Sequence, residues 1–203
     1  MNNRLQLVDL LPDNSKGVEI GVQFGEFSEE LCKTGKFSEL YSIDSWLDNF
    51  DDVKYWIDGE ILNEVDLSVK KSWTNGDWDT AESVYKKAVD RLGKYPASRV
   101  LKMDQKVASD LFEEEYFDFV YIDSAHDEKN VLETILHWFP TVKTNGIIAG
   151  DDYADMCGIY EVKNGRKIIA TIEVKSVVDS VFPDANIFVH NNGKKQWWVR
   201  KQQ

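Results

Sequence analysis

The sequence predicts an α/β protein built on a mostly parallel sheet that closes with an antiparallel hairpin. Apolar runs at residues 117–122 and 146–150 each end in aspartate, and helical spacing of apolar residues separates them. Later in the chain, two short apolar stretches flank the turn at residues 191–193, Asn-Asn-Gly. Such a turn is typical of a β-hairpin. Strands and helices that alternate early, followed by a late hairpin, indicate a parallel sheet with a reversed edge strand.

The stretch from residue 117 to residue 150 is predicted to be a strand, a helix and a strand. Continuous apolar runs of this length are typical of buried strands. The helix is indicated by the spacing of its apolar residues, and Pro140 ends it. These apolar residues are Val131, Leu132, Ile135, Leu136 and Phe139. Because the crossover is right-handed, the two strands run parallel and their carboxyl ends lie side by side.

The other strands are read from shorter apolar runs in the same way. A first strand at residues 17–22 leads through a glycine turn into a helix that opens near Ser28. The remaining expected strands cover residues 40–43, 99–103, 168–172, 185–189 and 196–199.

Length and composition favour one domain, residues 1–203, with an aromatic-rich insertion at about residues 45–80. The insertion is interpreted either as a lid whose aromatic side chains stack on an acceptor, or as short helices packed on the sheet. The formal charge of -12 argues against a nucleic-acid partner. Cys32 and Cys157 lie in no metal or redox spacing, and neither a signal peptide nor a membrane-length apolar run is present. We therefore expect a cytoplasmic protein without a membrane partner.

Four polar residues are expected at the carboxyl edge of the sheet. Asp123 ends one strand, Asp151 and Asp152 end the next, and His126 follows Asp123 closely. Neighbouring carboxylates repel, so a compensating cation is predicted, and oxygen ligands favour Mg²⁺, Ca²⁺ or Mn²⁺. The alternative is that these aspartates cap helices or lie solvated in loops.

The first glycine turn predicts a ligand that contains ribose but no phosphate. Gly21 and Gly25 have GxxxG spacing, and the GxGxxG pattern of a pyrophosphate site is absent. Asp44, at the end of the second strand, can accept hydrogen bonds from both ribose hydroxyls. A tight strand-to-helix turn is the other explanation for the two glycines.

The sequence resembles a known family in four segments, VEIGVQFGEFSEEL, YSIDSW, FDFVYIDSAHDEKNVLETILHWFP and NGIIAGDDY. It is similar to the class I S-adenosylmethionine-dependent methyltransferases, and among them to the small-molecule O-methyltransferase branch. That branch includes macrocin and mycinamicin O-methyltransferases and cephalosporin-hydroxylase-like proteins. The resemblance covers residues 17–153 directly and implies a Rossmann-like fold. It matches the later part only in outline, and residues 158–167 look like an extra hairpin without an assigned role.

The resemblance also implies roles for individual residues. Metal ligands would be Asp123, Asp151 and Asp152, holding Mg²⁺ or another hard divalent cation. The catalytic residues would be His126, as general base, and Asp123. The cofactor-binding residues would be Glu19, Gly21, Gly25, Asp44, Asp104, Gln105 and Asp123.

The expected function is metal-dependent O-methylation of a small hydroxylated metabolite, such as a sugar or glycoside. Methyl transfer from a sulfonium is an in-line displacement, which a metal-bound hydroxyl and a base at His126 would assist. His126 has an alternative role as a hydrogen-bond partner of Asp127. Two other functions remain open, a metal-independent methyltransferase acting on nitrogen or another acceptor, and a binding protein without turnover. The edge hairpin suggests a homo-oligomer by analogy with the fold.

Overall fold

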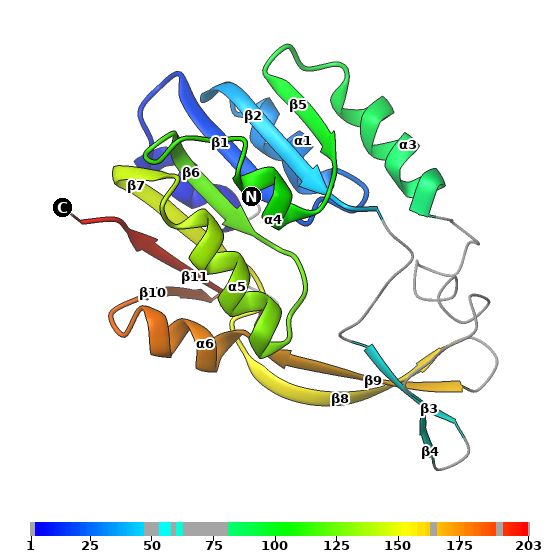
Figure 1. Cartoon of the computed structure of the whole chain (residues 1–203). Helices are drawn as coiled ribbons and strands as arrows, with labels where there is room; N and C mark the ends of the chain where they lie inside the picture. Colours follow the sequence, from blue (N-terminus) through cyan, green and yellow to red (C-terminus); the bar gives the residue numbers. More distant parts are fainter. Residues whose placement is uncertain are drawn as a thin grey trace.

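A computed structural model describes residues 3–46, 53–57, 60–62, 81–162, 166–189 and 193–202 of the chain. Its centre is a seven-stranded sheet in the order β10-β11-β7-β6-β1-β2-β5 (Figure 1). The strands β7, β6, β1, β2 and β5 pair in parallel with one another, and β11 runs antiparallel to both β7 and β10. The strands are β1 (Ser15–Ile20), β2 (Phe37–Asp44), β5 (Ser98–Lys102), β6 (Phe117–Ile122), β7 (Val142–Gly150), β10 (Asn186–Val189) and β11 (Lys195–Arg200).

Helices cover both faces of this sheet. On one face lie the 3₁₀ helix η1 (Asn3–Leu10) and α1 (Glu26–Lys33), and α3 (Ala81–Leu92) packs beside α1. The other face carries α4 (Gln105–Ser109), α5 (Glu128–Trp138) and α6 (Val174–Val181). Strand β6 contributes to both layers, because its side chains alternate between the two faces. Phe119 and Tyr121 pack with η1 and α1, whereas Val120 and Ile122 pack with α5 and α6.

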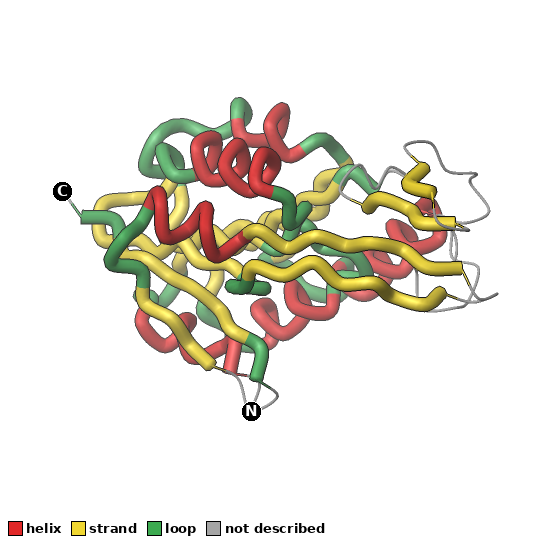
Figure 2. The backbone as a smooth tube through the Cα atoms, turned by 90° about the horizontal axis from the view of Figure 1, so that it is seen from below, coloured by secondary structure: helices red, strands yellow, loops and turns green. Residues whose placement is uncertain are grey.

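A second sheet of four strands extends from the carboxyl end of the first (Figures 1 and 2). Its order is β4-β3-β9-β8, all antiparallel, and we call it the small sheet. The strands are β3 (Val53–Ile57), β4 (Glu60–Leu62), β8 (Asp155–Val162) and β9 (Arg166–Glu173). It joins two segments far apart in the chain, because Val53 of β3 pairs with Ala170 of β9.

The predicted fold class is confirmed, including the strand-helix-strand unit, the terminal hairpin and the extra hairpin near residues 158–167. The strand expected at 168–172 forms within β9, in the small sheet. Within the predicted insertion at 45–80, residues 47–52, 58–59 and 63–80 lie outside the described residues, and so do residues 191–192 of the hairpin turn. The helices of the described chain are all too short or too polar to traverse a lipid bilayer.

Candidate active site

The candidate site forms where the parallel strands end. Backbone hydrogen bonds continue the sheet for one residue past three strands, from Gly21 N to Ile43 O (2.9 Å), from Asp123 N to Ile20 O (2.8 Å), and from Asp151 N to Ile122 O (3.1 Å). These bonds fix the backbone of the first residue after β1, β6 and β7. The carboxyl edge of such a sheet is the usual ligand site of open α/β folds.

The glycine turn and the end of β2 are held together by Asp44. Its Oδ2 accepts hydrogen bonds from the backbone N–H groups of Val22 and Gln23, both at 2.9 Å, and its Oδ1 accepts one from Trp46 N at 2.7 Å. Asp44, the residue predicted to bind the ribose, therefore also holds the surrounding loop in place through these hydrogen bonds. Gly25 stands at the N-cap position of α1 with a φ of 74°.

Three residues that are not glycine have left-handed backbone angles beside the site. They are Gln23 (φ 49°), Trp46 (φ 41°) and Asp152 (φ 49°), which follow β1, β2 and β7. This conformation is uncommon outside glycine, and such strain collects at functional sites. The Trp46 indole N–H donates to Gln23 O at 2.9 Å and so links two of the three turns.

Glu19 is buried inside β1, one residue before the end of that strand. Its carboxyl accepts a hydrogen bond from the Ser28 hydroxyl, which also lies 2.6 Å from the Ser42 hydroxyl. Burial raises the pKa of Glu19 to about 8, and the nearby carboxylates of Asp123 and Asp44 add to the shift. At neutral pH Glu19 therefore holds its proton in the folded protein.

Replacing Glu19 by glutamine is expected to flatten the pH dependence of stability. An ordinary glutamate has a pKa of 4.5, against about 8 in the folded protein. Between these values the unfolded chain releases a proton that the folded chain keeps, so the free energy of unfolding falls as the pH rises, by at most about 1.4 kcal/mol per pH unit. Urea unfolding at pH 5 and pH 8 tests this. Parallel pH profiles for wild type and Glu19→Gln would contradict it.

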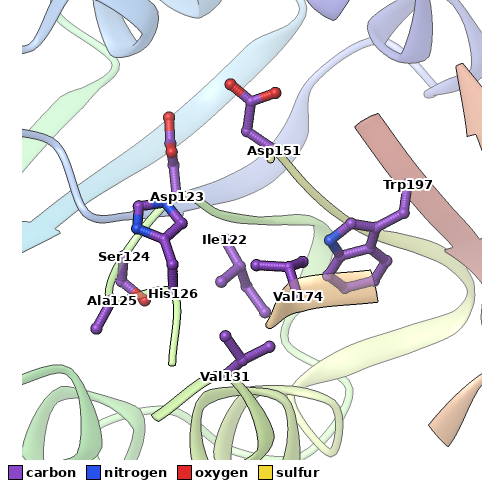
Figure 3. Close-up of a pocket in the computed structure, with 9 residues that line it drawn as sticks. All are labelled: Ile122, Asp123, Ser124, Ala125, His126, Val131, Asp151, Val174 and Trp197. Atoms are coloured by element: carbon purple, nitrogen blue, oxygen red, sulfur yellow. The ribbon is translucent and has the colours of Figure 1, made fainter. Parts of the chain in front are cut away.

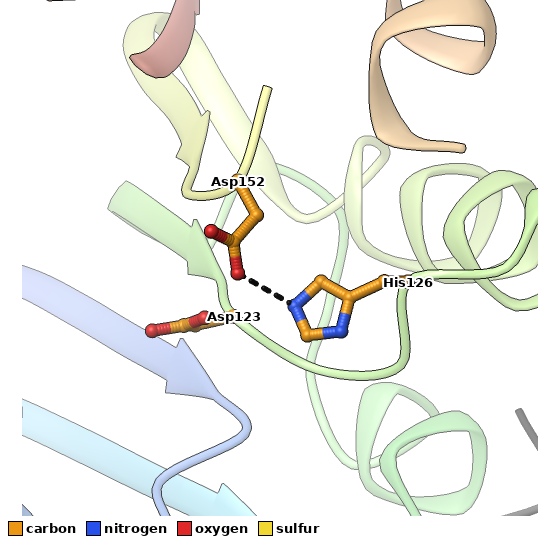
Figure 4. A group of neighbouring side chains, drawn as sticks. All are labelled: Asp123, His126 and Asp152. Carbon is orange, nitrogen blue, oxygen red and sulfur yellow. Dashed lines mark ion pairs between the residues drawn. The ribbon is translucent and has the colours of Figure 1, made fainter. Parts of the chain in front are cut away.

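Asp123, His126 and Asp152 form a compact cluster of metal-ligand types (Figure 4). One ligand atom from each side chain lies within 4.8 Å of the others. His126 Nε2 lies 3.1 Å from Asp152 Oδ2, and all three residues are partly buried. The cluster joins the end of β6, the loop before α5 and the end of β7. Two carboxylates and an imidazole can hold a divalent ion such as Mg²⁺, Mn²⁺ or Zn²⁺.

The two aspartates of the cluster differ in their electrostatics. The hydrogen bond with His126 lowers the pKa of Asp152 to about 2, and the charge of Lys194, whose Nζ is 3.5 Å from Asp152 Oδ1, contributes. Burial raises the pKa of Asp123, and the charge of Arg4 opposes that shift. Asp152 is thus ionised at neutral pH. The ionised form of Asp123, which burial disfavours, is the one that an added cation would stabilise most.

Asp151, the third predicted metal ligand, is not one of the three residues of this cluster. Its side chain is only 1% exposed and contacts the guanidinium of Arg4, while Arg4 NH1 lies 3.4 Å from Asp123 Oδ2. Arg4 therefore bridges the ends of β6 and β7, and its guanidinium also lies over the Phe27 ring at 5.2 Å. The structure thus brings His126 next to Asp123 and Asp152, and it gives Asp151 an arginine as its counter-ion.

Arg4 was not among the site residues predicted from the sequence. The residue lies in η1, a 3₁₀ helix without the 3.6-residue periodicity that locates a helix face in a sequence. The available signal was indirect, because three acids at one sheet edge require a cation, and an arginine is as suitable as a metal ion.

Asp104 and Gln105, both expected to bind the cofactor, make internal contacts. Asp104 is the N-cap of α4, and its side chain accepts hydrogen bonds from Lys106 N and Val107 N. Gln105 donates to Thr134 Oγ1 at 3.0 Å and accepts from Trp138 Nε1 at 2.8 Å. The Gln105 amide therefore faces α5.

A small pocket opens beside the cluster, between the ends of β6 and β7 and α6 (Figure 3). Asp123, His126 and Asp151 supply polar groups, and Val174 and Trp197 line its apolar side. The buried hydroxyl of Ser124, also in the lining, has no hydrogen-bond partner among the described residues. A polar group of this kind marks a place where a ligand can donate or accept.

Comparisons with known proteins identify the family of the chain. The family described as "Methyltransferase domain" matches residues 18–153. No curated protein gives a significant match to the sequence.

Solved structures share the fold at low sequence identity. A SAM-dependent methyltransferase from Methanosarcina mazei is 11% identical with a TM-score of 0.61, and the match covers 97% of both chains. The 1,6-didemethyltoxoflavin-N1-methyltransferase of Burkholderia thailandensis, with bound S-adenosylhomocysteine, is 10% identical with a TM-score of 0.54 over 99% of this chain and 76% of that one. Spermidine synthase from Thermotoga maritima is 14% identical with a TM-score of 0.54, over 96% of this chain and 55% of that one. By family and by fold, the chain belongs to the class I S-adenosylmethionine-dependent methyltransferases.

Proposed function

We propose that the enzyme transfers the methyl group of S-adenosylmethionine to a hydroxyl group of a small metabolite with the help of a divalent metal ion. The observation that carries the proposal is the cluster of Asp123, His126 and Asp152, with ligand atoms within 4.8 Å of one another. A sugar or glycoside is the substrate class we favour, from the resemblance to the macrocin and mycinamicin O-methyltransferases.

In this proposal, different residues of the chain bind the cofactor and the metal. The turn after β1, held by Asp44, receives the ribose and the methionine part of the cofactor. Asp123, His126 and Asp152 would hold the metal, which lowers the pKa of a bound hydroxyl when present. Lys194 is 57% exposed and can withdraw from Asp152. Alignment of the acceptor oxygen with the methyl carbon is the main catalytic requirement of the displacement.

A second candidate function is methyl transfer without a metal. The favouring observation is the 3.1 Å contact between His126 Nε2 and Asp152 Oδ2, because a carboxylate that orients an imidazole is the usual arrangement of a general base. In this case the acceptor can be nitrogen or oxygen, and Asp152 only orients His126.

Calorimetric titration with S-adenosylhomocysteine, in Mg²⁺ and in a chelator, separates these candidates. Cofactor binding in both solutions, together with a separate Mg²⁺ or Mn²⁺ binding signal, supports the metal-dependent enzyme. Cofactor binding without any metal signal supports the second candidate. No binding of S-adenosylhomocysteine under either condition would refute both.

Asp44→Ala is expected to weaken S-adenosylhomocysteine binding by at least about tenfold, since each lost charge-assisted hydrogen bond costs roughly 1.5–3 kcal/mol. The variant removes three backbone contacts as well as the predicted ribose contact. Asp44→Asn keeps one acceptor oxygen and serves as the matched control. Metal binding should be unchanged in both variants, and equal loss of cofactor and metal binding would contradict separate sites.

A further inference from the structure

The hairpin β8–β9 begins and ends beside the two loops that carry His126 and Asp152. Strand β8 starts shortly after Asp152, and β9 ends at Glu173, directly before α6. At the start of β8, the base of the hairpin is fixed to α6. Asp155 Oδ1 accepts a hydrogen bond from Ser176 N at 2.9 Å, and Ala154 O accepts one from Lys175 N at 3.2 Å. No role for this hairpin followed from the sequence.

At the end of β9, Glu173 makes two hydrogen bonds to the loop that carries His126. Its backbone N–H donates to His126 O at 2.8 Å, and its Oε2 accepts from Glu128 N at 2.8 Å. One residue therefore holds both ends of the segment 126–128. Between them, Asp127 caps α5 by accepting from Asn130 N at 3.1 Å.

This arrangement fixes the backbone from which the His126 side chain extends. Glu128 is the first residue of α5, and its N–H has no partner inside the helix. The Glu173 carboxylate supplies that partner from another element and also places a negative charge at the helix N-terminus, where it is favourable. Without it, segment 126–128 keeps one anchor from Glu173 in place of two.

We propose that Glu173 is a positioning residue, which sets the contact between His126 and Asp152 and thereby ties the small sheet to the active site. The proposal rests on the proposed function, in which His126 and Asp152 act together. It gives the hairpin β8–β9 a role in support of the site. Because β9 also pairs with β3, a displacement of the small sheet would reach His126 through Glu173.

Histidine side-chain NMR of the full-length protein tests the contact directly. The sequence has only three histidines, and His126→Gln assigns the signal of interest. In Glu173→Ala the His126 ring signals should shift, and in Glu173→Gln they should stay near the wild-type positions, because an amide oxygen still accepts from Glu128 N. His137, whose Nδ1 lies 2.8 Å from Glu133 O on α5, is the internal control and should not change.

Asp155→Ala is the matched control variant. It removes an acceptor of one backbone N–H from the base of the same hairpin and leaves segment 126–128 untouched. It should lower the melting temperature as Glu173→Ala does, without shifting the His126 signals. Equal shifts in Asp155→Ala and Glu173→Ala would overturn the proposal in favour of a general loosening of the hairpin.

Mn²⁺ affinity, measured by electron paramagnetic resonance without any acceptor, gives a second readout. Glu173→Ala should weaken Mn²⁺ binding about three- to tenfold, the usual effect of one hydrogen bond, while S-adenosylhomocysteine affinity stays constant. If wild type binds no Mn²⁺, the metal-dependent function fails and the NMR result still decides the positioning role. Unchanged His126 signals in Glu173→Ala would refute the proposal.

Discussion

Asp152→Asn is expected to abolish metal binding and metal-dependent turnover while S-adenosylhomocysteine binds as in wild type. Asparagine tolerates the left-handed backbone of this position, where φ is 49°, so the change removes the charge without forcing the turn to rearrange. Loss of one of two carboxylate ligands should weaken Mn²⁺ binding by more than about 100-fold. Substitution of a residue that only hydrogen-bonds to a metal ligand already lowers metal affinity by about 10- to 100-fold.

Asp151→Asn is the natural comparison, since it makes the same chemical change one residue away. Asp151 is paired with Arg4 in a buried position, so we expect Asp151→Asn to lower the free energy of unfolding by about 3 kcal/mol and to leave Mn²⁺ binding within a few-fold of wild type. Urea unfolding and Mn²⁺ titration of both variants give the answer. The reverse pattern, with metal binding lost in Asp151→Asn and kept in Asp152→Asn, would restore Asp151 to the metal site.

Gly21→Ala should destabilise the protein and impair both cofactor and metal binding. Gly21 has a φ of 88°, and a Cβ there would lie 2.1 Å from the carbonyl oxygen of Asp123. The backbone of β6 would have to move away from the glycine turn, which separates Asp123 from its partners. The left-handed angle and the overlap together cost about 3 kcal/mol or more in unfolding free energy.

Gly35→Ala isolates the part of that cost that comes from the backbone angle. Gly35 has a φ of 69°, and a Cβ there would meet nothing within 4 Å among the described residues. We expect a loss of about 1 kcal/mol and unchanged ligand binding. Thermal unfolding and S-adenosylhomocysteine titration of the two variants provide the comparison. Similar losses in both would show that the contact between Gly21 and Asp123 is unimportant.

The central sheet could be predicted because its signals are local. The run from 117 to 122 is largely apolar, since β6 is buried on both faces, and the helical spacing in α5 identifies the crossover between β6 and β7. The right-handed crossover then places Asp123 beside the acids that end β7. The sequence alone therefore predicts that Asp123, His126, Asp151 and Asp152 meet at one edge of the sheet.

Which side chains contact one another at that edge could not be predicted from the sequence in the same way. Asp151 and Asp152 are adjacent, and which one faces His126 depends on the left-handed turn at Asp152, which aspartate permits but does not require. The pairing of Arg4 with Asp151 joins residues from opposite parts of the chain. Contacts of this kind follow from packing in three dimensions and have no pattern along the sequence.

The small sheet has a consequence for protein engineering. Its middle pair, β3 and β9, comes from two insertions, one after β2 and one after β7, and Tyr55 is in register with Ile168. A chimera that receives only one insertion from a relative would present a strand with a foreign partner. Transplanting the small sheet between homologues therefore requires the exchange of both segments together, with their register preserved.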